Sequence, residues 1–384
     1  MNNNIKNNIP QLESKRAWVE VDLKALSYNV ASLTNSLPTG CELMSVVKTN
    51  AYGIGAKAIA AHLWSAGVKS FAVSSVFEGI QLRENGLSGE ILILGYTHPN
   101  DVKYLNEYNL KQLVLDEAHA AELNDAGYKI GVHIGIDTGM RRLGIKHANI
   151  AEIERIYTLE NLTVEGVSSH LSVSDSLLPD DIEFTRTQIS NFTDTIETLK
   201  SKNYDVGKRN ILSSFGVINY PDAAFELIRV GIALYGLVDS EKRTELKQKL
   251  PLKPVVSLKA NVVSVRLVEA GESVSYGRLF KAEKPTKVAT ISIGYADGIP
   301  RCISGKDGYC IIRGKKAPII GRICMDWLMV DVTKFELVAP GDTATLIGRD
   351  GDEEIHCEDF AEICGTITNE ILCGISKRLP RIYV

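Results

Sequence analysis

The sequence lacks three features that would place it in a specialised class of protein. Its seven cysteines contain no CxxC pair, so no zinc site is expected, and their odd number argues against a disulfide framework. Lysine and arginine number 43 against 47 acidic residues, and the resulting net charge of −4 predicts no nucleic-acid partner. No apolar run approaches the roughly 18 to 20 residues that span a bilayer. These absences predict a cytoplasmic protein that acts on a small molecule.

The N-terminus also lacks the apolar centre of a signal peptide. Residues 1–15 are rich in asparagine, and we interpret them as a flexible leader or linker. The whole chain has 384 residues, of which 45% are hydrophobic and 23% charged, as in ordinary globular proteins. This length predicts two domains.

Between residue 40 and about residue 235, short β-rich runs alternate with longer amphipathic stretches. Eight runs are predicted to be strands: 43–47, 71–75, 91–95, 112–115, 130–136, 164–168, 210–214 and 227–232. Apolar residues recur at helical spacing at 56–66, 76–85, 116–126 and 181–201. Eight β/α units in one run predict an N-terminal (β/α)8 barrel of the TIM type over residues 16–250.

The texture changes after Leu237. A charged helical stretch at 239–249 leads to Pro251 and Pro254, and β-rich pieces separated by Gly and Pro follow. The predicted strands are 255–268, 286–293, 309–312, 328–332 and 343–347, with helices only at about 357–373. We therefore expect a mostly antiparallel C-terminal β domain over residues 251–384.

The chemistry is expected at the C-terminal ends of the barrel strands, because the loops there converge on one mouth. Lys48 follows the first predicted strand, Arg142 the fifth and His170 the sixth, while Ser214 ends the seventh and Arg229 lies in the eighth. Each alone is an ordinary residue, but five at one rim predict a site. A lysine of lowered pKa can form a Schiff base with an aldehyde cofactor, and an arginine can hold a pyridine nitrogen. Pyridoxal 5'-phosphate (PLP) is the cofactor that this combination predicts.

The segment Val-Val-Lys-x-Asn-Ala-Tyr-Gly around Lys48 resembles the PLP lysine motif of bacterial alanine racemases. The resemblance covers essentially the whole chain from Arg16. Six further motifs match in the same order, at residues 137–140, 229–236, 274–277, 294–298, 321–326 and 365–367. The resemblance implies a PLP-dependent amino-acid racemase that acts as a homodimer with active sites shared between subunits.

The resemblance assigns two catalytic bases. Lys48 would bind the cofactor and serve as one base, and Tyr276 of the partner subunit would serve as the other. Racemisation removes a proton from one face of Cα and returns one to the opposite face, so it needs a base on each side. A free tyrosine titrates near about pH 10, so Tyr276 needs help, which a hydrogen bond through His170 to Arg229 would give. Arginine, with a pKa above about 12, would leave the pyridine nitrogen unprotonated.

The resemblance also assigns the binding residues. Arg142 would bind the cofactor's phenolic oxygen and the substrate carboxylate, the amide of Met325 would help to hold that carboxylate, and Tyr295 would line the access channel. The cofactor's phosphate would be surrounded by Tyr52, Ser214, Gly231 and Ile232. His170 would pack against its ring, and Arg229 would face its pyridine nitrogen.

Four residues near the site depart from the family pattern. Gly135 stands where many members have a lysine that steadies Arg142, so chloride, a nearby carboxylate or a looser arginine is expected instead. Ile54, Asn210 and Arg141 also differ from the common residues, and the sequence alone suggests no reason.

Asn369 stands where the family has a tyrosine that touches the phosphate and narrows the substrate pocket. A short amide in place of a phenol should leave room beside the substrate's β-carbon and offer both a donor and an acceptor to a hydroxymethyl group. This difference predicts that serine is a substrate beside alanine. The alternative is that Asn369 only replaces the lost phosphate contact.

Three functions therefore stay open. The first is a serine/alanine racemase that resembles the catalytic domains of the membrane-bound racemases of vancomycin-resistance operons, in which case residues 1–15 would be a linker after a membrane domain. The second is a biosynthetic alanine racemase with the same mechanism. The third is a non-catalytic PLP-binding barrel, for which the β domain and Tyr276 would be superfluous.

Overall fold

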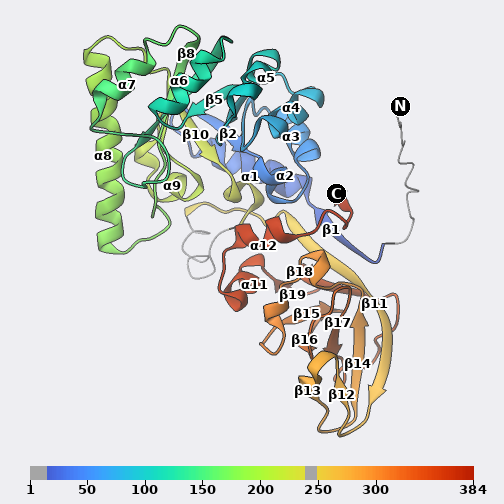
Figure 1. The fold of residues 1–384 in the computed structure, drawn as a ribbon. Coiled ribbons are helices and arrows are strands. Elements are labelled where there is room, and N and C mark those ends of the chain that lie inside the picture. Colours follow the sequence, from blue (N-terminus) through green and yellow to red (C-terminus); the bar gives the residue numbers. More distant parts are fainter. Residues whose placement is uncertain (1–14, 238–248) are drawn as a thin grey trace, which may run out of the picture. The chain divides into compact units, whose positions relative to one another are not determined.

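The computed structural model describes residues 15–237 and 249–384, which form two compact units (Figure 1). One unit is Asp22–Val255, and the other is Val256–Val384 together with residues 15–21. The predicted leader and the predicted helix at 239–249 lie almost entirely outside the described residues. Within the described residues, none of the helices combines the length and the apolar character needed to cross a membrane.

The first unit is built on an eight-stranded parallel sheet in the order β10-β2-β3-β4-β5-β6-β8-β9. Its two ends meet where the Arg229 amide donates to the Leu212 carbonyl at 3.0 Å. The strands are β2 (Glu42–Val46), β3 (Ser70–Val73), β4 (Glu90–Ile93), β5 (Lys111–Val114), β6 (Ile130–Asp137), β8 (Leu162–Ser168), β9 (Lys208–Asn210) and β10 (Leu227–Val230). Strands such as β3 and β10 are buried at every residue, as expected of parallel strands covered on both faces. The predicted barrel is confirmed.

Helices surround these strands (Figure 1). The longer ones are α1 (Leu23–Asn35), α3 (Ala56–Ser65), α4 (Val76–Glu84), α5 (Val102–Glu107), α6 (Glu117–Asp125), α7 (Ile150–Ile156) and α8 (Pro179–Ser201). Three of them begin at a side chain that accepts a backbone amide of the first turn: Asp22 for α1, Ser75 for α4 and Asp116 for α6. These caps fix where each of the three helices begins.

The seventh strand is shorter than predicted. Only Lys208–Asn210 pair with β8, and the predicted strand end at Ser214 instead begins helix α9 (Ser214–Asn219). The backbone between β9 and α9 bonds to β10 instead, because the Leu212 carbonyl accepts from the Arg229 amide. Ser214 therefore occupies the first turn of a helix, directly after the strand.

The second unit contains a nine-stranded sheet in the order β19-β18-β15-β16-β17-β14-β11-β1-β20. Strand β18 also pairs with β11, so the strands from β11 through β14, β17, β16 and β15 return to their starting point. The strands are β11 (Val256–Val268), β14 (Thr286–Ile291), β15 (Tyr309–Ile312), β16 (Lys315–Ile320), β17 (Leu328–Asp331), β18 (Thr343–Asp350), β19 (Glu353–Ile355) and β20 (Arg381–Tyr383). Helices α11 (Cys357–Cys364) and α12 (Thr368–Gly374) lie between β19 and β20 in the chain. Among the described strands of this unit, β1 and β20 are the one parallel pair, so the predicted, mostly antiparallel domain is confirmed.

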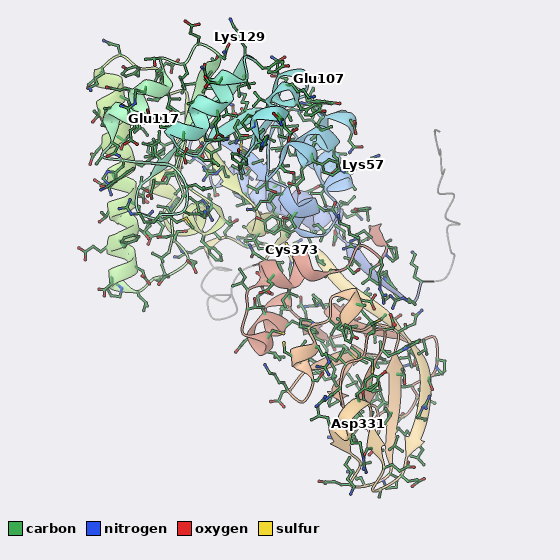
Figure 2. All side chains as sticks on the ribbon, viewed as in Figure 1. Lys57, Glu107, Glu117, Lys129, Asp331 and Cys373 are labelled. Atoms are coloured by element: carbon green, nitrogen blue, oxygen red, sulfur yellow. The ribbon has the colours of Figure 1, made fainter. Side chains whose placement is uncertain are left out.

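Strand β1 (Ala17–Val21) differs from the sequence-based division, which placed residues 16–250 in the barrel. It pairs with β11 in antiparallel register, with Val19 opposite Leu258. Its alternate residues are buried, as in a strand that covers one face of a sheet. Figure 2 draws the side chains on this ribbon, with Lys57 marking α3 in the barrel unit and Asp331 the end of β17 in the other unit.

Candidate active site

Lys48 lies at the C-terminal end of β2, where it begins the short helix α2 (Lys48–Tyr52). The next four residues, Thr49, Asn50, Ala51 and Tyr52, have φ angles of 55°, 55°, 52° and 53°. A left-handed conformation costs roughly 1–2 kcal/mol for each residue that carries a Cβ. Contacts around the turn must therefore hold it in place, and backbone strain of this kind concentrates at functional sites.

Tyr52, Gly231 and Ser214 form a small polar cradle. Tyr52 is buried, and a Cβ added to Gly231 would lie only 2.2 Å from the Tyr52 hydroxyl, so glycine allows this hydroxyl to approach the backbone. The Ser214 hydroxyl accepts from the amides of Gly231 and Ala233, each at 3.2 Å. Ile232 lies between these two amides. Two hydroxyls beside a close backbone loop are suited to hold a phosphate.

Arg229, which belongs to β10, is in contact with His170, which follows β8. Arg229 is buried, and its Nη2 donates to the Ser169 carbonyl at 2.6 Å and lies 3.2 Å from Nδ1 of His170. Burial, together with the charge of Arg142, lowers the pKa of Arg229 to about 10, so the guanidinium is still a cation at neutral pH.

His170 is surrounded by positive charge. Burial is the main reason that its pKa is lowered to about 3, and the charges of Arg229, Arg142 and Lys48 lower it further. The structure therefore brings together four predicted site residues that follow or belong to four different strands. Three of them, Arg229, Arg142 and Lys48, carry positive charge around the neutral His170, and this charge favours an anionic ligand.

Tyr276 belongs to the second unit and begins a single 3-10 turn, Tyr276–Arg278. Its side chain is 69% exposed within this chain. Ser275 before it has a φ of 66° and donates through its hydroxyl to the Arg322 carbonyl at 2.6 Å, which fixes the start of the turn. Tyr276 also lines a cavity of about 610 Å³ in the same unit, together with Trp327 and Met329. The phenol is thus presented on a well-anchored turn.

Three further predicted residues, Tyr295, Met325 and Asn369, lie in the second unit on three segments. The amide of Tyr295 donates to the Cys324 carbonyl at 3.0 Å, and that of Ala296 to the Met325 carbonyl at 3.0 Å, so these loops are joined. Among the described residues, the Met325 amide has no acceptor, which suits a role in binding a carboxylate. Asn369 is half-buried in the first turn of α12, with the Thr368 hydroxyl 3.4 Å from its Oδ1.

Comparison with known proteins assigns the family. Residues 21–239 match the family described as alanine racemase, N-terminal domain, and residues 255–383 match alanine racemase, C-terminal domain. The chain belongs to the alanine racemase family. The motifs predicted the fold and the activity of this family, and both predictions are confirmed for the family as a whole.

Individual relatives of this chain support the same family assignment. Alanine racemase 1 of Clostridium acetobutylicum is 39% identical over 373 residues, covering 96% of this chain and 95% of that protein. The serine/alanine racemase of Enterococcus gallinarum is 38% identical over 365 residues, covering 95% of this chain but only 51% of that protein. The chain thus spans about half the length of this second relative.

A solved structure with a ligand is also similar. Alanine racemase from Bartonella henselae, with covalently bound pyridoxal phosphate, has a TM-score of 0.85 and 30% identity, covering 97% of this chain and all of that one. The barrel residues of this chain fit the same group, because the Gly231 cradle has hydroxyls for a phosphate and Arg229 is a buried cation. The expected cofactor, PLP, is confirmed.

The structure explains two of the departures from the alanine racemase pattern, at Gly135 and Arg141, by the contacts of these residues. A Cβ at Gly135 would lie 2.6 Å from the Val114 carbonyl oxygen, so a side chain there would require the backbone to shift. Arg141 pairs with Asp137 at 2.9 Å, and that carboxylate also accepts the amides of Gly139 and Arg141. The nearby carboxylate is therefore used by Arg141, and among the described residues Arg142 has no ion pair.

Two other departures are structural. Asn210 is fully buried and donates through its amide to the Ser168 hydroxyl at 2.8 Å, which ties β9 to β8. Ile54 is fully buried after the left-handed turn. One matched motif residue is structural as well, since buried Asp297 binds Arg16 at 2.5 Å and Arg378 at 2.6 Å.

Proposed function

We propose that this protein interconverts the L and D forms of alanine and of serine, with Lys48 and Tyr276 of the partner subunit as the two bases. The observation that carries the proposal is the cluster in which the charge of Lys48 acts on His170, whose Nδ1 lies 3.2 Å from Arg229. It combines an amine that can bind an aldehyde with a buried cation that can face a ring nitrogen.

The barrel unit supplies the residues for PLP. Tyr52, Ser214, Gly231 and Ile232 would surround the phosphate, and the Arg229 guanidinium would meet the pyridine nitrogen. Bound at Lys48, PLP would stabilise negative charge at the substrate Cα. Arg229 with a pKa of about 10 would still leave that nitrogen unprotonated, because pyridine binds a proton far more weakly.

Proton transfer is assigned to two side chains on opposite faces of Cα. Lys48 would take or return the proton on one face and Tyr276 of the partner subunit on the other. Neutral His170, held by Arg229, would hydrogen-bond to the phenol and favour its ionised form. Arg142 and the Met325 amide would hold the substrate carboxylate, and Tyr295 would line the access channel.

The proposal includes a homodimer. Tyr276 is 69% exposed on its own chain, together with Trp327 at 44% and Leu279 at 47%, so the face around the second base is apolar and open. A second copy of the chain would cover this face and would receive the phenol in its own barrel. Each site would then need residues from two chains.

Serine is included because of Asn369. Its short, half-buried amide has the Thr368 hydroxyl 3.4 Å from its Oδ1, and the amide offers a donor and an acceptor to a hydroxymethyl side chain. The relative named a serine/alanine racemase supports this part of the proposal, whereas the relative named alanine racemase 1 supports the narrower alternative of alanine alone. A pocket that only tolerates a hydroxyl discriminates weakly, so we expect both amino acids to react.

The first test is the formation of D-amino acids from L-Ala and L-Ser at matched concentrations. We expect both products, and we expect Lys48→Ala to abolish them together with the visible absorption of the bound cofactor. A Lys48→Ala protein that kept full activity would remove Lys48 from the proposal, and a wild-type protein that binds PLP but forms no D-amino acid would favour the non-catalytic alternative.

The second test is Asn369→Tyr, with kcat/KM measured for both substrates. We expect the ratio of serine to alanine activity to fall, because the phenol would refill the space that the amide leaves. An unchanged ratio would return the assignment to alanine racemase alone.

A further inference from the structure

The left-handed turn after Lys48 sets the relative places of two site residues. Lys48 begins the turn and Tyr52 ends it. Because side-chain direction follows from the backbone angles, any relaxation of Thr49, Asn50 and Ala51 toward right-handed values would redirect the amine and the hydroxyl relative to each other. The turn is made without glycine at these positions, so its own preference opposes this conformation.

Glu78, in the first turn of α4, binds this turn directly. Its Oε1 accepts the Thr49 amide at 2.6 Å and lies 3.4 Å from the Asn50 amide. Its Oε2 accepts both the amide and the hydroxyl of Ser74, each at 2.9 Å. One carboxylate thus connects the loop after β3 to the two amides that follow Lys48.

We propose that Glu78 is a positioning residue for the racemase site: its carboxylate holds the left-handed turn and thereby sets where the Lys48 amine and the Tyr52 hydroxyl lie. The inference rests on the roles proposed above for Lys48 and Tyr52. Glu78 itself contacts the turn rather than the substrate.

A carboxylate suits these contacts better than other side chains. The groups that Glu78 binds all donate to it: the amides of Thr49, Asn50 and Ser74 and the Ser74 hydroxyl. An ionised carboxylate only accepts, so it matches this set. A glutamine could still accept from Thr49, but its NH2 group would face the Ser74 amide, donor against donor. We therefore expect glutamine to keep part of the function and alanine to lose it.

Capping of α4 does not account for the carboxylate. The helix already has a cap, because the Ser75 hydroxyl accepts the Glu78 amide at 3.3 Å. The sequence Ser75-Val76-Phe77-Glu78 has the spacing of a capping box, in which the glutamate would return to the amide of Ser75. In the structure the carboxylate instead binds Ser74 and Thr49.

The experiment compares Glu78→Ala and Glu78→Gln in the PLP-loaded enzyme, with Glu84→Ala as the matched control. Glu84 is an exposed carboxylate at the end of the same helix, so its replacement by alanine removes one carboxylate from the helix without touching the turn. The measurements are Tm, kcat and KM for alanine at saturating cofactor, and amide hydrogen exchange across residues 48–53.

We expect Glu78→Ala to speed exchange across residues 48–53 and to lower kcat by roughly 10- to 100-fold, the effect of a reacting group displaced by about 1 Å. KM should stay close to wild type, because the carboxylate of the substrate is assigned to Arg142 and Met325 in other loops. Glu78→Gln should fall between alanine and wild type, and Glu84→Ala should match wild type.

Wild-type exchange and wild-type kcat in Glu78→Ala would overturn the proposal. If that variant does not fold, Glu78→Gln decides: a lower Tm with unchanged exchange and kcat would make Glu78 a purely structural residue. Hydrogen exchange does not depend on turnover, so a wild-type protein without racemase activity would refute the proposed function while the exchange result still tests the hold on the turn.

Discussion

Nη2 of Arg229 lies 3.2 Å from Nδ1 of His170. A guanidinium can only donate, so Nδ1 accepts and the neutral ring carries its proton on Nε2. The pKa of about 3 keeps this tautomer neutral at physiological pH. His170 therefore offers one N–H donor whose direction is fixed by a buried cation, which is the group that a phenolate from the other subunit would need.

Replacing Tyr276 by phenylalanine should separate proton removal from racemisation. Both directions of the reaction need both bases, so interconversion should nearly stop. Lys48 should still exchange the Cα proton of one enantiomer with solvent. We expect mass spectrometry in D2O to detect deuterium in one enantiomer only, and equal incorporation into both, or normal racemisation, would remove Tyr276 from this role.

Mixing two inactive variants tests whether a site takes its bases from two chains. In a mixed dimer of Lys48→Ala and Tyr276→Phe, one site lacks both bases and the other has both, so activity should return to about half of the wild-type value per mixed dimer. The control is each variant mixed with itself. If the two bases came from one chain, every site in the mixed dimer would lack one base and activity would stay absent.

The protonation of His170 should make stability depend on pH. Its folded pKa of about 3 lies below its ordinary value of 6.5, so the unfolded chain binds more protons between these values and the folded state weakens as pH falls through this range. Glu226, whose pKa is lowered from 4.5 to about 2, also stabilises the folded state, but this contribution is lost only when the pH falls below about 4.5.

The measurement is the urea midpoint at pH 7.5 and 5.5 for wild type and His170→Gln, in which the amide oxygen can still accept from Arg229. We expect a smaller drop in the variant. Some drop should remain, because burial also lowers the pKa of His119 and His133. An equal drop in both proteins would show that His170 is not a buried neutral group.

Gly231→Ala should weaken cofactor binding with little effect on the fold. Its Cβ would lie 2.2 Å from the Tyr52 hydroxyl, so Tyr52 must move out of the phosphate cradle. Overpacking of this kind costs about 1–3 kcal/mol, which predicts roughly a ten- to hundred-fold loss of PLP affinity. The matched control is Gly374→Ala, where a Cβ meets nothing within 4 Å, and equal PLP affinity in both variants would contradict the cradle.

The amino-acid sequence by itself determined the two-part architecture and the number of barrel strands, and it grouped candidate site residues at one rim. Hydrophobic periodicity involves only residues close in the sequence, so it can be recognised without the tertiary structure. The residues at the C-terminal ends of parallel barrel strands meet at one rim, even when the loop conformations are unknown. Lys48, His170 and Arg229 could therefore be grouped before their distances were known, and the structure brings them together.

Other features depended on contacts between distant residues. Ala17–Val21 alternates like a strand, but only the register with β11, more than 230 residues away, decides which sheet it joins. The left-handed φ values after Lys48 oppose the preferences of their own residues, and the carboxylate that binds this turn comes from Glu78 in a separate helix, α4. Likewise, the absence of a side chain at Gly135 follows from the position of the Val114 carbonyl. Local sequence does not encode such close approaches, because they arise only when separate segments pack.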